Sequence, residues 1–418
     1  PIGYHARKVM KKFSGIYTTS LATNMPQTHW IFTVSSVVTT NDVGVYLMSG
    51  ATKSKVEFAG DIVAESYGFL SEASGVMLTV SKTANITSHG GGIVLNANNQ
   101  TIRNFGSIYG AEEFGIGVGG EHLAIYNAGK IGGPAGIWAL VVDSEIFNDR
   151  SGRIVGSYVG IVLTADRFDT STTINHGLIA GRAIAFDSGD GNDTLINSGR
   201  IVGGATAFRS GDGNDTLINS GRIVGDVYLG FGDDRFDGRS GSLKGQVIGG
   251  YGSDIYIIDH SEIKLLEDSV VGVDTVWSSV SFQLPQNFER LFLTGNNDIN
   301  AHGTAGAEYL VGNRGDNDIR GNGGRDALEG RKGDDRLFGG AQSDVFTFRS
   351  GDGHDKVMNF ENGVDFLIVD DWSRIGGYQG ALAHATERDG NLIITAGSDQ
   401  LTLIGMTKAE LDPSDFVI

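Results

Sequence analysis

The chain has 418 residues, a formal net charge of −18, 64 glycines, 5 prolines and no cysteine. The absence of cysteine excludes disulfide bridges and thiolate metal sites, and the negative charge argues against a nucleic-acid partner. The sequence contains no run of about 18 uncharged apolar residues, so we predict no membrane-spanning segment. Glycine at about twice its usual frequency favours a fold with many tight turns.

The region before residue 225 repeats the pattern G-x-I-x-G at a nearly constant interval. Its central isoleucines, roughly 22 to 25 residues apart, mark a solenoid, and the short β-branched segments between glycines are typical of strands. We therefore predict an all-β fold that begins as a right-handed parallel β-helix with stacked isoleucines in its interior. These residues are Ile108, Ile131, Ile154, Ile179, Ile201 and Ile223, with weaker copies at Ile62 and Ile86.

An asparagine stands before most of these units, in nearly the same place each time. Equivalent residues of stacked strands lie about 4.8 Å apart, so amides at this position can bond to one another in a ladder. We predict a structural role for Asn104, Asn127, Asn148, Asn175, Asn197 and Asn219.

The coil between Asn148 and Asn175 is longer than its neighbours and holds the candidate catalytic residues. Asp166 and Arg167, with Tyr158 and His176 nearby, would place an acid, a base and an aromatic side chain on one rim. A surface loop stabilised by an Asp–Arg pair is the alternative. The sequence contains neither H-E-x-x-H nor G-x-S-x-G.

Glycine-rich turns between residues 188 and 257 place acids at intervals close to one coil. Asp193, Asp215, Asp234 and Asp254 are 22, 19 and 20 residues apart, and Asp190 and Asp212 add charge to the same turns. Two carboxylates about 5 Å apart repel by about 3 kcal/mol at an effective dielectric of about 20. A stacked column of them therefore predicts cations between coils, although solvated turn aspartates are the alternative.

Three tandem nonapeptides, GNGGRDALE, GRKGDDRLF and GGAQSDVFT, run from Gly321 to Thr347 with the spacing G-G-x-G-x-D-x-U-x, where U is a large apolar residue. The glycines permit positive φ, the aspartate offers a hard oxygen ligand for Ca²⁺, and U points into the core. Two nonapeptides make one coil, so two opposite columns are expected. The first holds Glu308, Asp326 and Asp344, the second holds Asn317 and Asp335, and a further copy carries Asp355.

These repeats resemble those of bacterial RTX (repeats-in-toxin) proteins of the type I secretion class, over roughly residues 186–418. The resemblance implies a calcium-binding parallel β-roll, export unfolded through a one-step channel, and folding outside the cell. The segment Val273–Asn313 is similar to the connector before RTX arrays, and the terminal Asp415–Ile418 to the uncleaved secretion signal. We expect a β-helix (1–186), coils with calcium-binding turns (187–258), a connector (259–302), a β-roll (303–358) and a C-terminal cap with secretion signal (359–418).

RTX repeats accompany proteases, lipases, epimerases, adhesins and toxins, so the resemblance does not name an activity. The acid–histidine motif of the C5-epimerases has only a partial counterpart at Tyr67–Glu72, where Leu70 and Glu72 replace the acid and the histidine. We predict a secreted, extracellular, non-enzymatic matrix, adhesion or glycan-binding protein. Its partners would be calcium ions, extracellular polysaccharide and the type I secretion machinery. The alternative is a polysaccharide lyase or C5-epimerase acting on acidic glycans in the β-helix groove.

Overall fold

The computed structural model describes residues 9–13, 21–23, 30–34, 37–49, 51–164, 170–268, 271–369, 372, 375 and 377–417. It divides into two compact units, residues 1–248 (unit 1) and 249–418 (unit 2). Strands and turns make up nearly all of the described residues, so the predicted all-β class is confirmed. The division at residue 248 falls inside the predicted segment 187–258, and the predicted domain limits stay predictions.

Helix is rare in the described residues. It comprises α1 (Tyr378–Ala383) and the short 3₁₀ turn η1 (Pro413–Asp415). Neither is long or apolar enough to cross a membrane.

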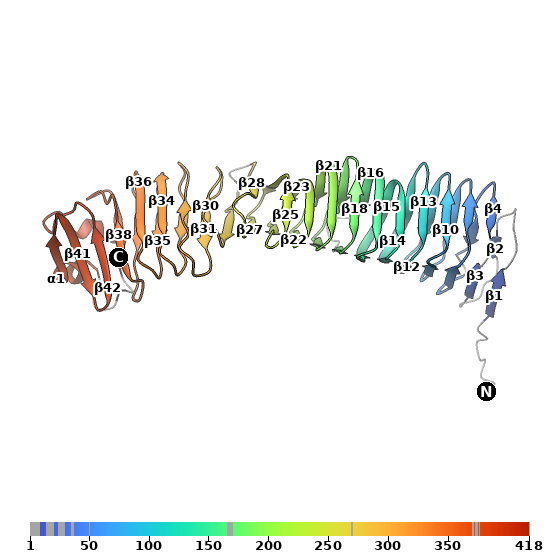
Figure 1. Cartoon of the computed structure of the whole chain (residues 1–418), viewed down its shortest axis with the longest axis horizontal. Coiled ribbons are helices and arrows are strands. Elements are labelled where there is room, and N and C mark those ends of the chain that lie inside the picture. Colours follow the sequence, from blue (N-terminus) through green and yellow to red (C-terminus); the bar gives the residue numbers. More distant parts are fainter. Residues whose placement is uncertain are drawn as a thin grey trace, which may run out of the picture. The chain divides into compact units, whose positions relative to one another are not determined.

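Unit 1 is a stack of coils in which each coil contributes three strands, and each strand pairs in parallel with its counterpart in the next coil (Figure 1). The long strands turn corners and join rows: β15 (Lys130–Asn148) runs through all three, and two rows are joined by β14 (Phe114–Asn127), β16 (Arg153–Leu163), β21 (Arg200–Arg209) and β23 (Arg222–Phe231).

The first row of strands carries the G-x-I-x-G pattern. Besides parts of β15, β16, β21 and β23 it contains β4 (Val38–Thr40), β7 (Ile62–Ala64), β10 (Asn85–Ser88), β13 (Ser107–Gly110), β18 (Leu178–Gly181) and β25 (Ser242–Lys244).

The second row follows the first around a corner of each coil. It contains β2 (Leu21–Thr23), β5 (Val45–Leu47), β8 (Tyr67–Ser71), β11 (Gly91–Asn96) and β19 (Ile184–Asp187).

The third row ends each coil, and from β12 to β22 its last residue is the ladder asparagine. It contains β1 (Val9–Phe13), β3 (Trp30–Val34), β6 (Lys55–Phe58), β9 (Met77–Val80), β12 (Gln100–Asn104), β17 (Thr172–Asn175), β20 (Thr194–Asn197), β22 (Thr216–Asn219) and β24 (Arg235–Asp237).

The predicted isoleucine column forms the interior of the first row. Its members from Ile62 to Ile223 pair in register and are at most 1% exposed. A second column of glycines makes room for them. A Cβ atom on Gly68 would lie 2.3 Å from Cγ2 of Ile86, and one on Gly92 would lie 2.8 Å from Cγ2 of Ile108. The glycine at the start of the second-row strand is therefore a packing requirement.

The asparagine ladder is also confirmed. From Asn104 to Asn219, each Nδ2 donates to the Oδ1 of the asparagine in the next coil, at 2.7–2.8 Å. All six side chains are buried. Because an amide carries both donors and an acceptor, each asparagine bonds to its neighbours in the column, and backbone groups such as the carbonyl of Lys130 and the N–H of Gly106 complete the bonding at Asn104.

Unit 2 has two facing rows of parallel strands. One contains β27 (Ile255–Ile258), β29 (Thr275–Ser278), β31 (Arg290–Leu293), β33 (Tyr309–Val311), β35 (Ala327–Glu329), β37 (Val345–Thr347) and β39 (Phe366–Ile368). The other contains β30 (Phe282–Gln283), β32 (Ala301–His302), β34 (Asp318–Gly323), β36 (Arg336–Ala341) and β38 (His354–Val357).

A three-stranded antiparallel meander extends the second row of unit 2 at its C-terminal end. It consists of β40 (Ala385–Arg388), β41 (Asn391–Ala396) and β42 (Asp399–Leu403), and β42 pairs in parallel with β38. The apolar U residues Leu328, Leu337 and Phe346 are fully buried, as the nonapeptide pattern predicts.

Candidate calcium sites

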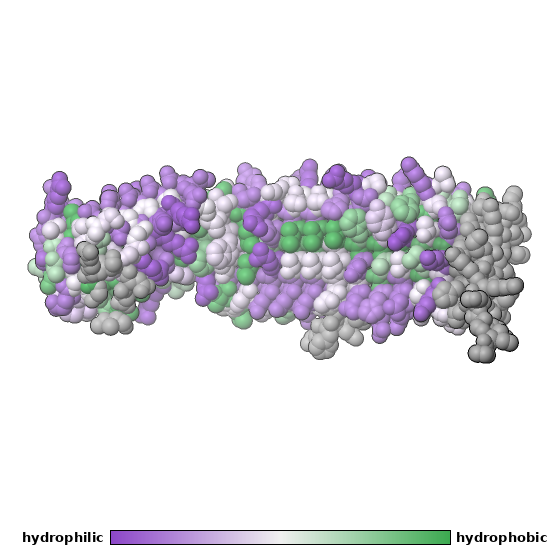
Figure 2. All heavy atoms as spheres, turned by 90° about the horizontal axis from the view of Figure 1, so that it is seen from below, coloured by the Kyte–Doolittle hydropathy of each residue, from purple (hydrophilic) through white to green (hydrophobic). Residues whose placement is uncertain are grey.

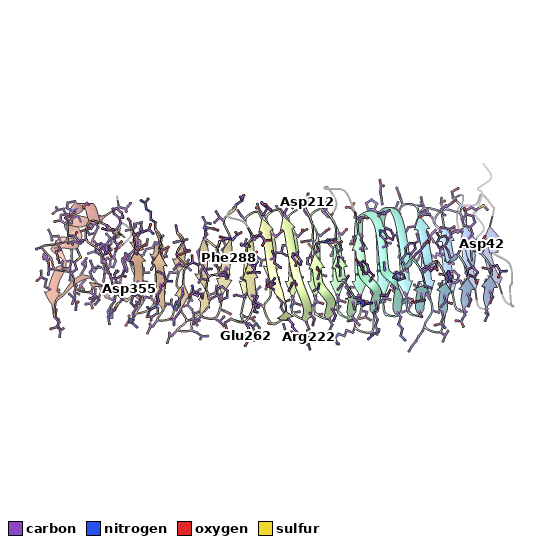
Figure 3. All side chains as sticks on the ribbon, turned by 90° about the horizontal axis from the view of Figure 1, so that it is seen from above. Asp42, Asp212, Arg222, Glu262, Phe288 and Asp355 are labelled. Atoms are coloured by element: carbon purple, nitrogen blue, oxygen red, sulfur yellow. The ribbon has the colours of Figure 1, made fainter. Side chains whose placement is uncertain are left out.

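The nonapeptide aspartates of unit 2 stack in two columns on opposite edges. In the first column the backbone N–H of Glu308 donates to Oδ1 of Asp326 at 2.8 Å, and the N–H of Asp326 donates to Oδ1 of Asp344 at 3.0 Å. In the second, the N–H of Asp335 donates to Oδ1 of Asp355 at 3.0 Å. The structure therefore groups Glu308 with Asp326 and Asp344 as their 18-residue spacing suggests, and it adds Asp355 to the second column at an interval of 20 residues. Asp355 lies within the strands of unit 2 in Figure 3.

A similar column lies in unit 1. The backbone N–H of Asp193 donates to Oδ1 of Asp215, and that of Asp215 donates to Oδ1 of Asp234, both at 2.7 Å. All three side chains are buried. Asp190 and Asp212 lie beside this column in half-buried turns, and the N–H of Asp212 donates to Oδ1 of Asp190 at 3.4 Å. Figure 3 shows Asp212 and Arg222 on opposite edges of unit 1.

Each of these hydrogen bonds uses one carboxylate oxygen and leaves the other buried. In the described part of the chain, Oδ2 of Asp215, Asp326, Asp335 and Asp344 has no hydrogen-bond partner. These side chains are at most 1% exposed. An unpaired ionised carboxylate is costly to bury, so the geometry calls for a cation or a proton at each position.

The first glycine of each nonapeptide makes room for this second oxygen. Oδ2 of Asp326 lies 2.1 Å from the place where a Cβ atom on Gly321 would be, and the carbonyl oxygen of Gly339 lies 2.5 Å from the same place. Oδ2 of Asp335 lies 2.3 Å from the equivalent point on Gly330. Hard oxygen atoms from a side chain and from the next coil thus converge over a bare glycine, and such oxygens are the ligands that Ca²⁺ prefers.

The degenerate copies differ from the strict array. The Asn317 amide donates to the carbonyl of Ile299 at 2.6 Å and to Oδ1 of Asn313 at 3.0 Å. Its own Oδ1 accepts from the N–H of Asn313 at 2.9 Å. Glu308 accepts from Thr304 with both of its oxygens. These two side chains, unlike Asp326, are satisfied by the protein itself.

A third acidic group gathers at the start of unit 2. Asp254, Glu267 and Asp274 are buried, and one ligand atom from each lies within 4.8 Å of the others. The hydroxyl of Tyr256 donates to Glu267, and the N–H of Gly250 donates to the same carboxylate at 3.1 Å. Burial, with the neighbouring acids, raises the pKa of Glu267 to about 8. This group is a further candidate site for a divalent cation.

Sequence reasoning missed four acids of these columns. Asp274 accepts from the N–H of Asp254, Glu289 from that of Asp274, and Asp365 from that of Asp344. Asp274 follows Asp254 by 20 residues and Asp365 follows Asp344 by 21, and these intervals of about one coil could have identified both acids as members of the columns. Glu267 comes from an irregular segment whose spacing carries no such signal.

The candidate catalytic residues of the long coil do not form a described cluster. Asp166 and Arg167 lie outside the described residues. Tyr158 is 65% exposed at the corner between the first and second rows. His176 follows the third row, at a different corner, where its ring meets that of Phe147 edge-on at 5.2 Å. Tyr158 and His176 are therefore not brought together.

Burial raises the carboxyl pKa values of the columns, and nearby acids add to the effect. The pKa is about 6 for Asp215 and Asp344, about 7 for Asp335 and about 8 for Asp355. Without a bound cation, these groups hold protons more tightly in the folded chain than in the unfolded one. A cation that binds beside Asp335 or Asp355 near neutral pH would therefore displace protons.

Comparison with known families identifies the array. Residues 302–335 and 320–355 match the model of the RTX calcium-binding nonapeptide repeat (4 copies). No curated protein matches the chain. Among solved structures, the extracellular lipase LipA from Serratia marcescens aligns at 14% identity over 55% of this chain and 45% of the lipase, with a TM-score of 0.20. The chain thus spans less than half of the lipase, and a score this low supports no inference about fold or activity.

The raised pKa values predict a pH-dependent stability in chelator. A carboxyl group whose folded-state pKa is raised contributes stability below its unfolded pKa of about 4, and this stability is lost as the pH rises through the folded value. Without calcium, unit 2 should therefore show a thermal unfolding transition at pH 5 and already be largely unfolded at pH 8. Asp335→Asn, which imitates the natural Asn317, should reduce this difference. Thermal melts followed by circular dichroism that show equal stability at both pH values would contradict the assignment.

Removing a carboxylate from a calcium column and removing a buried apolar side chain from the same nonapeptide should have different effects. Asp335→Ala should weaken calcium binding but leave a protein that folds at higher calcium. Leu337→Ala should destabilise the calcium-loaded form by about 2–5 kcal/mol, because it removes a fully buried side chain, while changing calcium binding less. Calcium titrations and unfolding in saturating calcium measure the two effects. The same calcium shift and the same stability loss in both variants would show that the columns are wrongly assigned.

Proposed function

We propose that this chain, an RTX calcium-binding repeat protein with an N-terminal parallel β-helix, is secreted and acts outside the cell as a non-enzymatic matrix, adhesion or glycan-binding protein. The observation that carries the proposal is the set of buried Oδ2 atoms of Asp215, Asp326, Asp335 and Asp344, which face no protein partner among the described residues. Such a solenoid is stable near neutral pH only with cations between its coils.

The construction of these sites favours an extracellular setting. At one nonapeptide position, the oxygens available as calcium ligands are those of a single carboxylate and of the backbone. Near Gly321, for example, they are Oδ2 of Asp326 and the carbonyl oxygen of Gly339. Calcium sites with few charged ligands are of the weak class that fills at about 0.1–1 mM, the range of extracellular modules. Export by a type I machinery as an unfolded chain, followed by folding in calcium, is consistent with this requirement.

The third-row face of unit 1 supports glycan binding. A groove of about 440 Å³ crosses several coils of this face. Next to it, Tyr126 and Phe147 stack at 5.5 Å, and Ile174, Ile196 and Ile218 continue the same outward row. On this face Figure 2 shows a green apolar stripe bordered by residues of intermediate hydropathy. An apolar stripe beside polar side chains suits a sugar chain with apolar faces and hydroxyl edges.

One observation favours the enzymatic alternative, a polysaccharide lyase or C5-epimerase. His122, Asp143 and Glu145 all line the groove, and Nδ1 of His122 lies 3.4 Å from Oδ2 of Asp143. An imidazole and a carboxylate at this distance are a possible acid–base pair. Both side chains are about half exposed, at 56% and 45%, so an ordinary surface ion pair fits the same geometry.

Calcium should drive folding of the full chain. In chelator near neutral pH we expect the nonapeptide region to be disordered, and calcium at about 1 mM should order it cooperatively. Magnesium should substitute poorly because it requires octahedral geometry and loses water reluctantly. Far-UV circular dichroism titrated with each ion measures this. Equal β-structure in chelator and in calcium would refute the proposal.

We expect no turnover of acidic polysaccharide by the groove. The whole protein would be incubated with alginate and with pectin in calcium, while absorbance of unsaturated uronates and NMR of the C5 configuration are followed. Turnover that is lost in His122→Ala or Glu145→Gln, but kept in Tyr158→Ala, would establish the lyase or epimerase instead. The exposed Tyr158 serves as control because it lies outside the groove lining.

A further inference from the structure

Unit 2 contains a second cavity that the calcium columns do not use. Its volume is about 630 Å³, a size typical of sites for small organic ligands. It combines one aromatic ring, several amide and hydroxyl groups, three cations and two acids. Its lining includes Trp277, Arg314, Glu329, Arg331, Lys332 and Asp352.

The aromatic side of the cavity is held rigidly. Trp277 in β29 stacks on Phe292 in β31, with ring centroids 4.5 Å apart and an interplanar angle of 14°. Phe292 in turn meets Tyr309 edge-on at 5.6 Å. The half-buried indole is thus fixed by neighbours on one side, which lowers the entropic cost of using it as a contact surface.

The cationic wall comes from the turns that lead into β34 and β36. Arg314 and Lys332 occupy the third position of two nonapeptides 18 residues apart, and Asp318 pairs with Arg336 at the same offset. Stacking places such residues about 4.8 Å apart along the edge. In the described part of the chain neither side chain forms an ion pair or a hydrogen bond. Two adjacent positive charges therefore remain available.

The remaining charges of the cavity are largely engaged. Glu329 accepts from the Tyr309 hydroxyl at 3.0 Å and forms an ion pair with Arg349, and Nε of Arg331 lies 3.6 Å from its Oε1. Asp352 accepts from the backbone N–H of Arg349 at 2.7 Å. The acids are bound by groups of the protein itself, whereas Arg314 and Lys332 are not.

We propose that this cavity binds a carboxylated sugar residue of an acidic polysaccharide, with the apolar face of the sugar on Trp277 and its carboxylate on Arg314 and Lys332. Guanidinium and ammonium groups form the strong, charge-assisted hydrogen bonds to carboxylates, and an aromatic face suits the C–H face of a sugar. The inference rests on the glycan-binding part of the proposed function and names the class of glycan.

Calcium and this ligand should be coupled. Arg331 and Lys332 belong to the same nonapeptide as Asp335, so the calcium that orders this turn also positions the cationic wall. Bound calcium also offsets the negative charge of the surrounding acids, which would otherwise repel an anionic chain. Because linkage is reciprocal, the ligand should in turn strengthen calcium binding.

The test uses the full chain in about 5 mM calcium, with folding of every variant checked by circular dichroism. The probes are a tetramer of galacturonic acid, its methyl ester, which has the same shape without the charge, and inorganic sulfate. Calorimetry should show the acid binding, the ester binding at least about tenfold more weakly, and sulfate failing to compete. Arg314→Ala, Lys332→Ala and Trp277→Ala should each weaken binding by about tenfold, whereas Lys332→Arg should retain it.

Arg325→Ala is the matched control, since this exposed arginine lies in the turn that enters β35 of the other row, and it should bind as the wild type does. The cavity is wrongly assigned if acid and ester bind equally, if sulfate displaces the tetramer, or if Arg314→Ala and Lys332→Ala bind normally. A folded wild type that binds no acidic tetramer refutes this inference and leaves calcium-driven folding intact. Failure of calcium to order the chain refutes the proposed function itself.

Discussion

A carboxylate that is satisfied at one oxygen and left buried at the other is the constraint on which the calcium-binding part of the molecule depends. At Asp326, Asp335 and Asp344 the backbone N–H of the preceding coil donates to one carboxylate oxygen, and a bare glycine leaves space for the second. The solenoid geometry that creates the hydrogen bond thus also creates the demand for a cation. Stability and ligand binding cannot be separated at these positions.

The asparagine ladder shows the same stacking without that demand. An amide supplies both donor and acceptor, so Asn127 and Asn148 complete each other at 2.8 Å, whereas a carboxylate supplies only acceptors. Asn317, which stands at an aspartate position of the array, finds protein partners for both ends of its amide. Replacing the carboxylate of an aspartate by the amide of an asparagine therefore decides whether protein groups alone complete the hydrogen bonding of the side chain or a cation is needed.

Contacts between residues that repeat at a fixed interval could be predicted from the sequence. Contacts between residues outside the repeats could not. The isoleucine and asparagine columns and the grouping of Asp326 with Asp344 follow directly from intervals of one coil. The groove residues His122, Asp143 and Glu145 come from neighbouring coils but carry no repeated motif, so nothing in the sequence marks them as neighbours. The cations Arg314 and Lys332 stand at a variable position of the nonapeptide, and only the folded turns show that they border a cavity with Trp277.

The hydrogen bonds within the carboxylate columns and the asparagine ladder all point the same way along the chain. In both kinds of column the donor belongs to the earlier coil and the acceptor to the later one, as from Asp193 to Asp215 and from Asn175 to Asn197. Each coil is therefore completed by the coil that follows it. The series in unit 2 stops at Asp365, whose other oxygen accepts from the nearby N–H of Glu361 at 2.8 Å. This local bond gives the carboxylate column a finished end, so the column is complete only when its C-terminal member is in place.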